Sequence, residues 1–261
     1  MQHLSAEERK ERILYELNNY GKVMVKQLAE QFGVTMETIR RDLDFLEIQC
    51  QLKRIHGGAI KISYDKTEPS HTQRRDVFRE EKQKIGHRAA NFINDDEVIA
   101  IDTGTTTCEI LYHLKDKKNI TVILNNIAAL NIIMDLKNKG LFHGKILFLG
   151  GEINTDQLSS FGPMSEKMMG DFYVDKAFIA VGGMSLKHGL TSYDMNEASL
   201  TQKIMENAKE VVVVADHSKI GVRNFYKICE IEETHMIVSD ENPPKEWEEF
   251  LGKNEMKWIK A

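Results

Sequence analysis

Cysteine, proline and long apolar runs are scarce in this chain of 261 residues, which contains three cysteines and four prolines. The longest apolar runs, such as "VVVVA" at 211–215, are far shorter than the roughly 18 residues that a membrane-spanning helix needs. The N-terminal stretch "MQHLSAEERKERI" has no apolar core of the kind found in signal peptides. These absences predict a soluble, cytoplasmic protein.

Metal and redox sites are not expected either. Cys50, Cys108 and Cys229 are too widely spaced for a disulfide framework or a CxxC metal site, so reduced thiols are expected. The nine histidines show neither HxH nor HExxH spacing. The run "DHS" at 216–218 superficially resembles a catalytic triad, but a triad is a spatial arrangement that neighbours in sequence rarely adopt.

The net charge of −5 gives no indication of nucleic-acid binding. Charge is nevertheless uneven along the chain, because residues 1–61 carry ten Lys and Arg against nine Asp and Glu, whereas the remainder has a net charge of −6. The positions of the N-terminal cations therefore matter more than the total.

Three helices are expected in the N-terminal region. The first, over 5–21, opens with a capping box formed by Ser5 and Glu8. An apolar stripe predicts a short second helix over 25–32 that a glycine stops, and a third helix is expected from the capping threonine at 35 to about residue 49. Two short helices joined by the turn "FGVT" are typical of a helix-turn-helix.

The third helix, "TMETIRRDLDFLE", has two distinct faces. Ile39, Leu43 and Leu46 lie on one side and are expected to be buried. Short polar and guanidinium groups lie on the other side near the N-terminus, where a recognition helix contacts bases in the major groove. The candidate DNA-contacting residues are Thr35, Glu37, Thr38, Arg40 and Arg41. The alternative is the ordinary charged outer face of an amphipathic helix.

The next segment predicts a β-wing. The stretch "LKRIHGGAI" at 52–60 alternates apolar and basic residues and then turns on two glycines. In such a wing Lys53, Arg54 and His56 lie against the sugar-phosphate backbone of DNA.

The stretches "VTMETIRRDLDFLE" and "LKRIHGGA" together resemble the winged helix-turn-helix of the DeoR family of bacterial transcriptional regulators. The resemblance implies sequence-specific binding to operator DNA. Cys50 stands where the family usually has the glycine that ends the recognition helix. If that position is left-handed, a Cβ there costs on the order of 1 kcal/mol, which is local strain and not a loss of function.

The composition changes after residue 61. Residues 62–78 are polar, contain a proline and show no periodicity, so they are expected to form a linker. Residues 79–261 then alternate β-branched runs with helical stretches, which predicts a parallel sheet covered on both faces. The expected fold is α/β, with a small winged helix-turn-helix domain at 1–61 joined to a larger Rossmann-like effector domain. The runs are "EVIAID", "ITVIL", "KILFLG", "AFIAVG", "VVVVAD" and "HMIVSD".

Nearly every run ends in Gly, Asp or Asn, at the strand edge where open α/β sheets bind ligands. After the first run, "IDTGTTT" at 101–107 combines a glycine that lets a ligand approach the backbone with threonines that open a helix and expose N–H groups to an anion. No GK[ST] or GxGxxG pattern is present, so ATP, NAD and other cofactors are not expected. A small phosphorylated metabolite fits better, and the alternative is that these residues only cap a helix.

Several further motifs resemble the C-terminal sensor domain of the DeoR family: "DTGTTT", "NN" at 125–126, "LGGEI" at 149–153, "DKAFIAVGG" at 175–183, "GLT" at 189–191 and "VADHSKIG" at 214–221. That sensor resembles ribose-5-phosphate isomerase and usually binds a phosphorylated sugar or a related intermediate. The resemblance implies an effector site formed by Asp102, Thr103, Gly104, Thr105, Thr106, Thr107, Asn125, Gly150, Gly151 and Lys219.

An isomerase that carries a DNA-binding domain is the alternative function. Aldose–ketose isomerisation needs an acid and a base beside the substrate. The isomerases carry a "DGADE" box where this sequence reads "VGGMS" at 181–185, and Glu197 is the nearest surviving carboxylate. Binding without turnover is therefore expected. The sequence predicts a ligand-controlled regulator that represses genes of carbohydrate uptake or breakdown. It is expected to work as a homodimer or homotetramer, because one winged helix reads one half-site.

Overall fold

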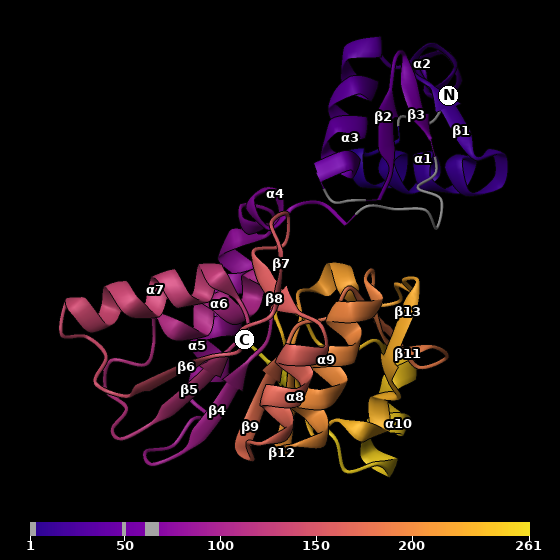
Figure 1. Ribbon diagram of the computed structural model, residues 1–261. Coiled ribbons are helices and arrows are strands. Elements are labelled where there is room, and N and C mark those ends of the chain that lie inside the picture. The colour runs from indigo at the N-terminus through magenta and orange to yellow at the C-terminus, as the bar shows by residue number, and fades with distance from the viewer. Residues whose placement is uncertain (1–3, 49–50, 61–67) are drawn as a thin grey trace. The chain divides into compact units, whose positions relative to one another are not determined.

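The computed structural model describes residues 4–48, 51–60 and 68–261. The chain divides into two compact units, Met1–Pro69 and Ser70–Ala261 (Figure 1). Cys50 and residues 62–67 of the predicted linker lie outside the described residues. The same holds for the side chains of Asn18, Asn19, Ile48 and Lys53.

The N-terminal unit contains the predicted helix-turn-helix. Its helices are α1 (Ala6–Tyr20), α2 (Val25–Phe32) and α3 (Met36–Ile48). The predicted capping box of Ser5 and Glu8 is confirmed at the start of α1. Gly21 and Gly33 end α1 and α2 with φ values of 71° and 65°, a left-handed conformation in which a Cβ is unfavourable.

Three short strands complete this unit. They are β1 (Lys22–Met24), β2 (Lys53–Ile55) and β3 (Gly58–Ile60), and they form an antiparallel sheet in the order β1-β3-β2. The sequence predicts the β2–β3 hairpin but not β1, because "KVM" is too short to show alternation. Since β1 links α1 to α2 and pairs with β3, it joins the helix-turn-helix to the wing.

The second unit is built on a sheet of seven parallel strands in the order β15-β14-β12-β9-β4-β5-β6. The strands are β4 (Val98–Ile101), β5 (Thr121–Leu124), β6 (Lys145–Phe148), β9 (Val174–Ile179), β12 (Ala208–Val214), β14 (Met236–Ser239) and β15 (Lys257–Lys260). The prediction of an α/β fold with a parallel sheet is confirmed. The edge strand β15 was not predicted, because "KWIK" is not a continuous apolar run.

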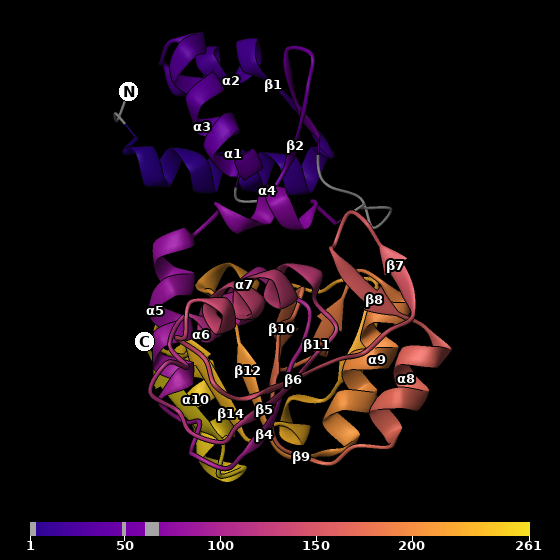
Figure 2. The same cartoon turned by 60° about the vertical axis from the view of Figure 1, so that its left-hand side comes forward.

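Helices cover both faces of this sheet (Figure 2). One face packs against α5 (Arg79–Ala90), α6 (Thr105–Leu111) and α7 (Ile127–Asn138), and the other against α8 (Pro163–Gly170), α9 (Met195–Glu206) and α10 (Lys245–Lys253). Along β12, Val212 and Val214 join the first core and Val211 and Val213 the second. Burial on both faces explains why these strands are continuous apolar runs.

Two smaller sheets follow the main strands. The hairpin β7 (Glu152–Asn154) and β8 (Ser159–Phe161) comes after β6. Strands β10 (Gly183–Ser185), β11 (Gly189–Ser192) and β13 (Tyr226–Cys229) form an antiparallel sheet after β9. Within the described ranges, no helix is both long and apolar enough to cross a membrane.

The structure differs from the predicted linker over residues 70–78, which belong to the second unit. Here α4 (His71–Arg75) begins with a capping box of Ser70 and Gln73. The His71 side chain is buried, and its backbone N–H donates to the carbonyl of Asp156 at 2.8 Å. The physical reason is the capping pattern "SHTQ", which starts a one-turn helix without any apolar periodicity.

Candidate functional site

The N-terminus of α3 presents the predicted DNA-contacting residues. Thr35 accepts a hydrogen bond from the backbone N–H of Thr38 at 3.1 Å and so caps the helix. The Arg40 and Arg41 side chains are 52% and 80% exposed, and both lie near Glu37, at 3.4 and 3.6 Å. Exposed ion pairs of this kind are weak, so Glu37 does not commit either guanidinium group to one partner.

Arg54 occupies a different environment from the other predicted contacts. Its guanidinium pairs with Asp44 and donates to the carbonyls of Gly58 at 3.2 Å and Arg40 at 3.3 Å, which leaves its side chain only 22% exposed. Arg54 therefore joins the wing to α3. His56 is exposed at the tip of the hairpin, whereas the side chain of Lys53 lies outside the described part of the chain.

A buried ion pair that the sequence did not reveal positions α3 on α1. Arg9 pairs with Asp42 through both its Nε and Nη2 atoms, and both residues are nearly inaccessible to solvent. Asp42 raises the pKa of the Arg9 guanidinium. Because the two residues are 33 positions apart, no local pattern indicates the pair.

In the second unit, the loop after β4 is built around Asp102. One carboxylate oxygen accepts from the Thr103 backbone N–H at 2.7 Å and the other from the Thr201 hydroxyl of α9 at 2.9 Å. Burial raises the pKa of Asp102 to about 7, and hydrogen bonds from Thr201, Thr103 and Asn125 partly offset that rise. A carboxylate bonded in this way fixes the start of the loop.

Gly104 and Thr107 shape the rest of this loop. A Cβ at Gly104 would lie 2.4 Å from the Cβ of Ala180, so the loop is in direct contact with the end of β9. The Thr107 hydroxyl donates within the loop to the carbonyls of Asp102 and Gly104, at 2.7 and 2.9 Å. Thr105 and Thr106 are also buried and form the first turn of α6, whose N–H groups have no acceptor within the helix.

The two asparagines after β5 have separate roles. Asn126 caps α7 by accepting from Ala129 at 3.1 Å, and its amide donates to the Gly104 carbonyl at 3.3 Å. Asn125 is 2% exposed, and its amide donates to the Ser160 carbonyl at 3.4 Å. Asn126 therefore holds the loop, whereas Asn125 keeps its amide oxygen for another partner.

The remaining predicted site residues lie after β6 and β12. At Gly151, with φ of 151°, an added Cβ would lie 2.2 Å from the Ser165 hydroxyl oxygen, whereas at Gly150 it would meet open space. Lys219 is half-buried at the end of the short 3₁₀ helix η1 (His217–Lys219), after β12. All of these positions follow the carboxyl ends of parallel strands of the main sheet, as the sequence predicts.

Lys82 is a further cation at this edge, and the sequence did not indicate it. Helices α5 and α6 lie side by side and run in parallel. A Cβ at Gly86 would lie 2.5 Å from the Cβ of Glu109. Further along the chain from each of these residues, the rings of His87 and His113 are 4.8 Å apart. One turn back along α5, Lys82 is therefore beside the first turn of α6. It is 5% exposed and donates to the Arg74 carbonyl at 2.5 Å. Burial lowers its pKa to about 8, with opposing effects from the nearby Asp216 and Lys219.

Asp216 and His217 do not form a triad. Asp216 accepts from the Ser218 backbone at 3.0 Å, whereas His217 Nδ1 lies 2.6 Å from a carboxylate oxygen of Asp240. The bond to Asp240 raises the pKa of His217. Glu241 brings a third potential metal-ligating atom within 4.8 Å, but it is exposed and the imidazole already has a partner.

Three buried polar atoms have no hydrogen-bond partner among the described residues: Thr103 Oγ1, Asn125 Oδ1 and Asn224 Nδ2. Thr103 and Asn125 follow β4 and β5. Asn224 lies against Gly182, just after β9, because a Cβ there would be 2.6 Å from its Nδ2. Buried polar groups are rarely left unpaired, so three at one edge of a sheet indicate a place for a polar ligand.

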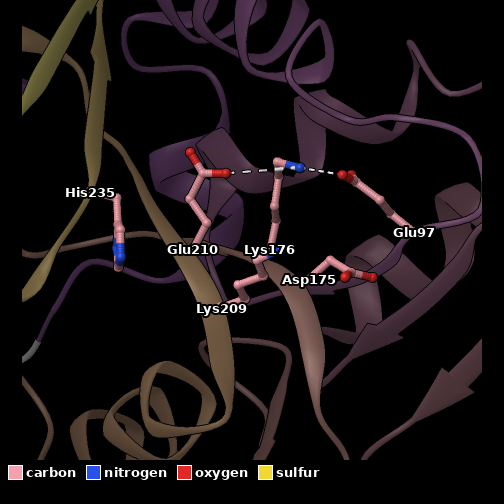
Figure 3. A pocket seen from close by; sticks show the side chains of 6 residues that line it. All are labelled: Glu97, Asp175, Lys176, Lys209, Glu210 and His235. Atoms are coloured by element: carbon pink, nitrogen blue, oxygen red, sulfur yellow. Dashed lines mark hydrogen bonds and ion pairs between the residues drawn. The ribbon is translucent and has the colours of Figure 1, made fainter.

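A separate cavity of about 250 Å³ lies at the opposite, amino-terminal edge of the sheet (Figure 3). It is lined by Glu97, Asp175, Lys176, Lys209, Glu210 and His235. Lys176 pairs with Glu97 and is 3.9 Å from Glu210. Lys176 therefore already has acidic partners within the protein, and the cavity lies away from the strand edge where α/β sheets bind ligands.

Both units match known domains. Residues 9–64 match the DeoR-like helix-turn-helix domain, and residues 77–241 match the DeoR C terminal sensor domain. This chain belongs to the DeoR family. It is 32% identical over 248 residues to the HTH-type transcriptional repressor GlcR of Bacillus subtilis, which covers 95% of this chain and 93% of that protein. It is 31% identical over 239 residues to the HTH-type transcriptional regulator IolR of Bacillus subtilis, covering 91% and 92%.

A relative in Escherichia coli is the glycerol-3-phosphate regulon repressor, 29% identical over 224 residues and covering 86% of each chain. Among solved structures, ribose 5-phosphate isomerase A of Methanocaldococcus jannaschii is similar, with 18% identity, a TM-score of 0.40 and coverage of 55% of each chain. The predicted family is confirmed, and its members are transcriptional regulators, not enzymes. This DeoR-family protein is a DNA-binding transcriptional regulator with a sensor domain.

Proposed function

We propose that this regulator represses genes of carbohydrate uptake or breakdown and that a phosphorylated sugar controls its DNA binding. The observation that carries the proposal is the set of unpaired buried atoms, Thr103 Oγ1, Asn125 Oδ1 and Asn224 Nδ2, at the carboxyl edge of the sheet. They include a hydroxyl, an acceptor and a donor, which suits a ligand with several hydroxyl groups. We name this set, with the 102–107 loop and Lys82, the sensor edge.

We propose that the phosphate of the effector binds at the 102–107 loop. The N–H groups in the first turn of α6 supply hydrogen bonds, and Lys82 supplies the positive charge that the loop itself lacks. Burying the charged Lys82 side chain costs free energy, and an anion bound beside it would offset that cost. Gly151 and Lys219 follow β6 and β12, each two strands away from β4, and extend the polar surroundings along the same edge of the sheet.

The class of effector follows from the chemistry of the sensor edge and from the relatives. The relatives GlcR and the glycerol-3-phosphate regulon repressor are both named as repressors, and the second is also named for a phosphorylated metabolite. A small phosphate ester with further hydroxyl groups suits both the loop and the two asparagines. We extend the repressor role to this chain by similarity.

Effector binding reaches the DNA-binding unit along the chain. Residues 70–78 come immediately after that unit in sequence, and α4 within them is held to the sensor edge. Lys82 donates to the Arg74 carbonyl, Arg74 donates to Gln157 at 2.5 Å, and His71 lies 3.9 Å from the Cys108 thiol. A phosphate that draws Lys82 away from Arg74 changes how α4 is held.

We further propose that the regulator works in the cytoplasm as a homodimer or homotetramer. Each winged helix contacts one operator half-site through Thr35, Glu37, Thr38, Arg40 and Arg41, with His56 and Lys53 on the wing. The effector favours one of two subunit arrangements, only one of which spaces the recognition helices to match the operator.

A thermal-shift screen of the full-length protein tests the proposal. We expect one pentose, hexose or glycerol phosphate to stabilise the protein by roughly 2.7 kcal/mol at 100 times its Kd, whereas the unphosphorylated sugar does not. Thr103→Val should weaken this shift, and Thr121→Val, at the amino-terminal end of β5, serves as the matched control. Equal stabilisation by sugars with and without phosphate would contradict the proposed site.

A further inference from the structure

Asn224 lies in the segment between η1 and β13 and is held rigidly. The residue is 7% exposed, and its backbone N–H donates to the Thr191 hydroxyl at 3.0 Å. The Thr191 hydroxyl in turn donates to the carbonyl of Gly183 at 3.1 Å. The Asn224 backbone is therefore held beside the end of β9, while its side-chain Nδ2 is buried and finds no acceptor in the part of the chain that the structure describes.

Two glycines allow this segment to approach the strand end so closely. A Cβ at Gly182 would lie 2.6 Å from Asn224 Nδ2, and a Cβ at Gly183 would lie 2.4 Å from the Val222 carbonyl oxygen. Any larger residue at either position would push the segment outward. The packing thus places the Asn224 amide beside Gly182, just after the carboxyl end of β9.

Asn224 is close enough to the 102–107 loop for one ligand to contact both. Gly104 contacts Ala180, and Gly182 is two residues further along the chain. Two residues of extended backbone span at most about 7 Å. The Asn224 amide therefore lies no farther from the loop assigned to the phosphate than a small sugar phosphate can reach.

We propose that Asn224 determines effector specificity by donating a hydrogen bond from Nδ2 to a hydroxyl or carbonyl oxygen of the sugar, at the end distant from its phosphate. This inference rests on the proposed function, because it needs the phosphate at the 102–107 loop. A site with a fixed buried donor discriminates against ligands that lack the matching oxygen, since the donor is then left unpaired. The effector class is a phosphate ester that carries such an oxygen away from the phosphate.

The test measures ligand affinity of the full-length protein by titration calorimetry. The probes are inorganic phosphate and the member of a panel of ribose 5-phosphate, fructose 6-phosphate, glucose 6-phosphate and glycerol 3-phosphate that stabilises the wild type most. We expect Asn224→Ala to weaken binding of that ester by about 10- to 100-fold. Affinity for inorganic phosphate should stay within about twofold, and Asn138→Leu, at the exposed end of α7, is the control.

A second variant separates binding from folding. Asn224→Leu replaces a buried unpaired amide with an apolar group of similar size, so the melting temperature should be kept while the ester affinity falls. Unchanged ester affinity in both variants would overturn the inference, because Asn224 Nδ2 would then donate to a water molecule and not to the effector. An equal loss for ester and inorganic phosphate would also overturn it. If the wild type binds no probe at all, the proposed function fails instead.

Discussion

Lys82 offers a sharp test, because a residue kept for binding an anion should reduce stability when no anion is bound. Its ammonium group is buried, and burial lowers its pKa from 10.5 to about 8. That difference corresponds to a destabilisation of about 3 kcal/mol at pH 7. Replacing Lys82 with Met removes the charge but also the bond to the Arg74 carbonyl, worth about 1 kcal/mol. We therefore expect Lys82→Met to raise the unfolding free energy by about 2 kcal/mol.

The pH dependence has a defined sign. Because the folded protein binds the Lys82 proton less tightly than the unfolded chain, the destabilisation is present in full below pH 8 and disappears as the pH rises toward 10.5. The stability difference between Lys82→Met and the wild type should therefore shrink over that interval. The same variant should bind phosphate esters more weakly, which is the usual conflict between stability and function.

Urea denaturation followed by tryptophan fluorescence measures this effect in the full-length chain. Both tryptophans, Trp247 and Trp258, lie in the second unit, and their rings are 5.6 Å apart. Lys84→Met is the matched control, because Lys84 is exposed on the same helix and its replacement should leave stability within about 0.5 kcal/mol. A Lys82→Met protein that is less stable than the wild type at pH 7 would show that the buried charge of Lys82 does not destabilise the fold.

Three further predictions concern other residues. Arg41→Ala should lower discrimination between operator variants by about 1–3 kcal/mol in DNA titrations, without loss of stability. Arg54→Ala should instead lower the stability measured by denaturation, because Arg54 joins the wing to α3. Burial, with nearby positive charge, lowers the pKa of His71 to about 4, so stability should fall by up to about 3 kcal/mol as the pH drops from 6.5 to 4. His71→Gln should flatten that fall in acid denaturation curves. Gly104→Ala should destabilise the second unit by about 1–3 kcal/mol and abolish effector binding in a thermal-shift assay, because the new Cβ clashes with Ala180.

Local patterns predicted the helix-turn-helix well because its boundaries are set by short-range chemistry. The Ser5–Glu8 capping box and the left-handed Gly33 act within a few residues, so the sequence alone locates them. The parallel strands were predictable for a similar reason, since burial on both faces requires continuous apolar runs. The linker at 62–78 was placed too far along the chain, because "SHTQ" starts α4 without any apolar periodicity.

The sensor edge was only partly predictable. Asp102 and Asn125 directly follow strands, and strand ends are visible in the sequence. Thr201 contacts Asp102 from 99 residues away, and Lys82 comes from a helix that precedes the loop. Asn224 follows no strand and matches no motif, and only the packing against Gly182 places it there. Side chains that reach a site from elements distant in sequence produce no local sequence pattern that would predict their role.

In the proposed mechanism, effector and operator compete through one conformational equilibrium. Thermodynamic linkage requires that, if the effector weakens operator binding by some factor, saturating operator weakens effector binding by the same factor. The measurement is the Kd of the stabilising sugar phosphate for the full-length protein, determined with and without saturating operator DNA. We expect about 5- to 150-fold weaker effector binding in the presence of operator, and an unchanged Kd would contradict the competition.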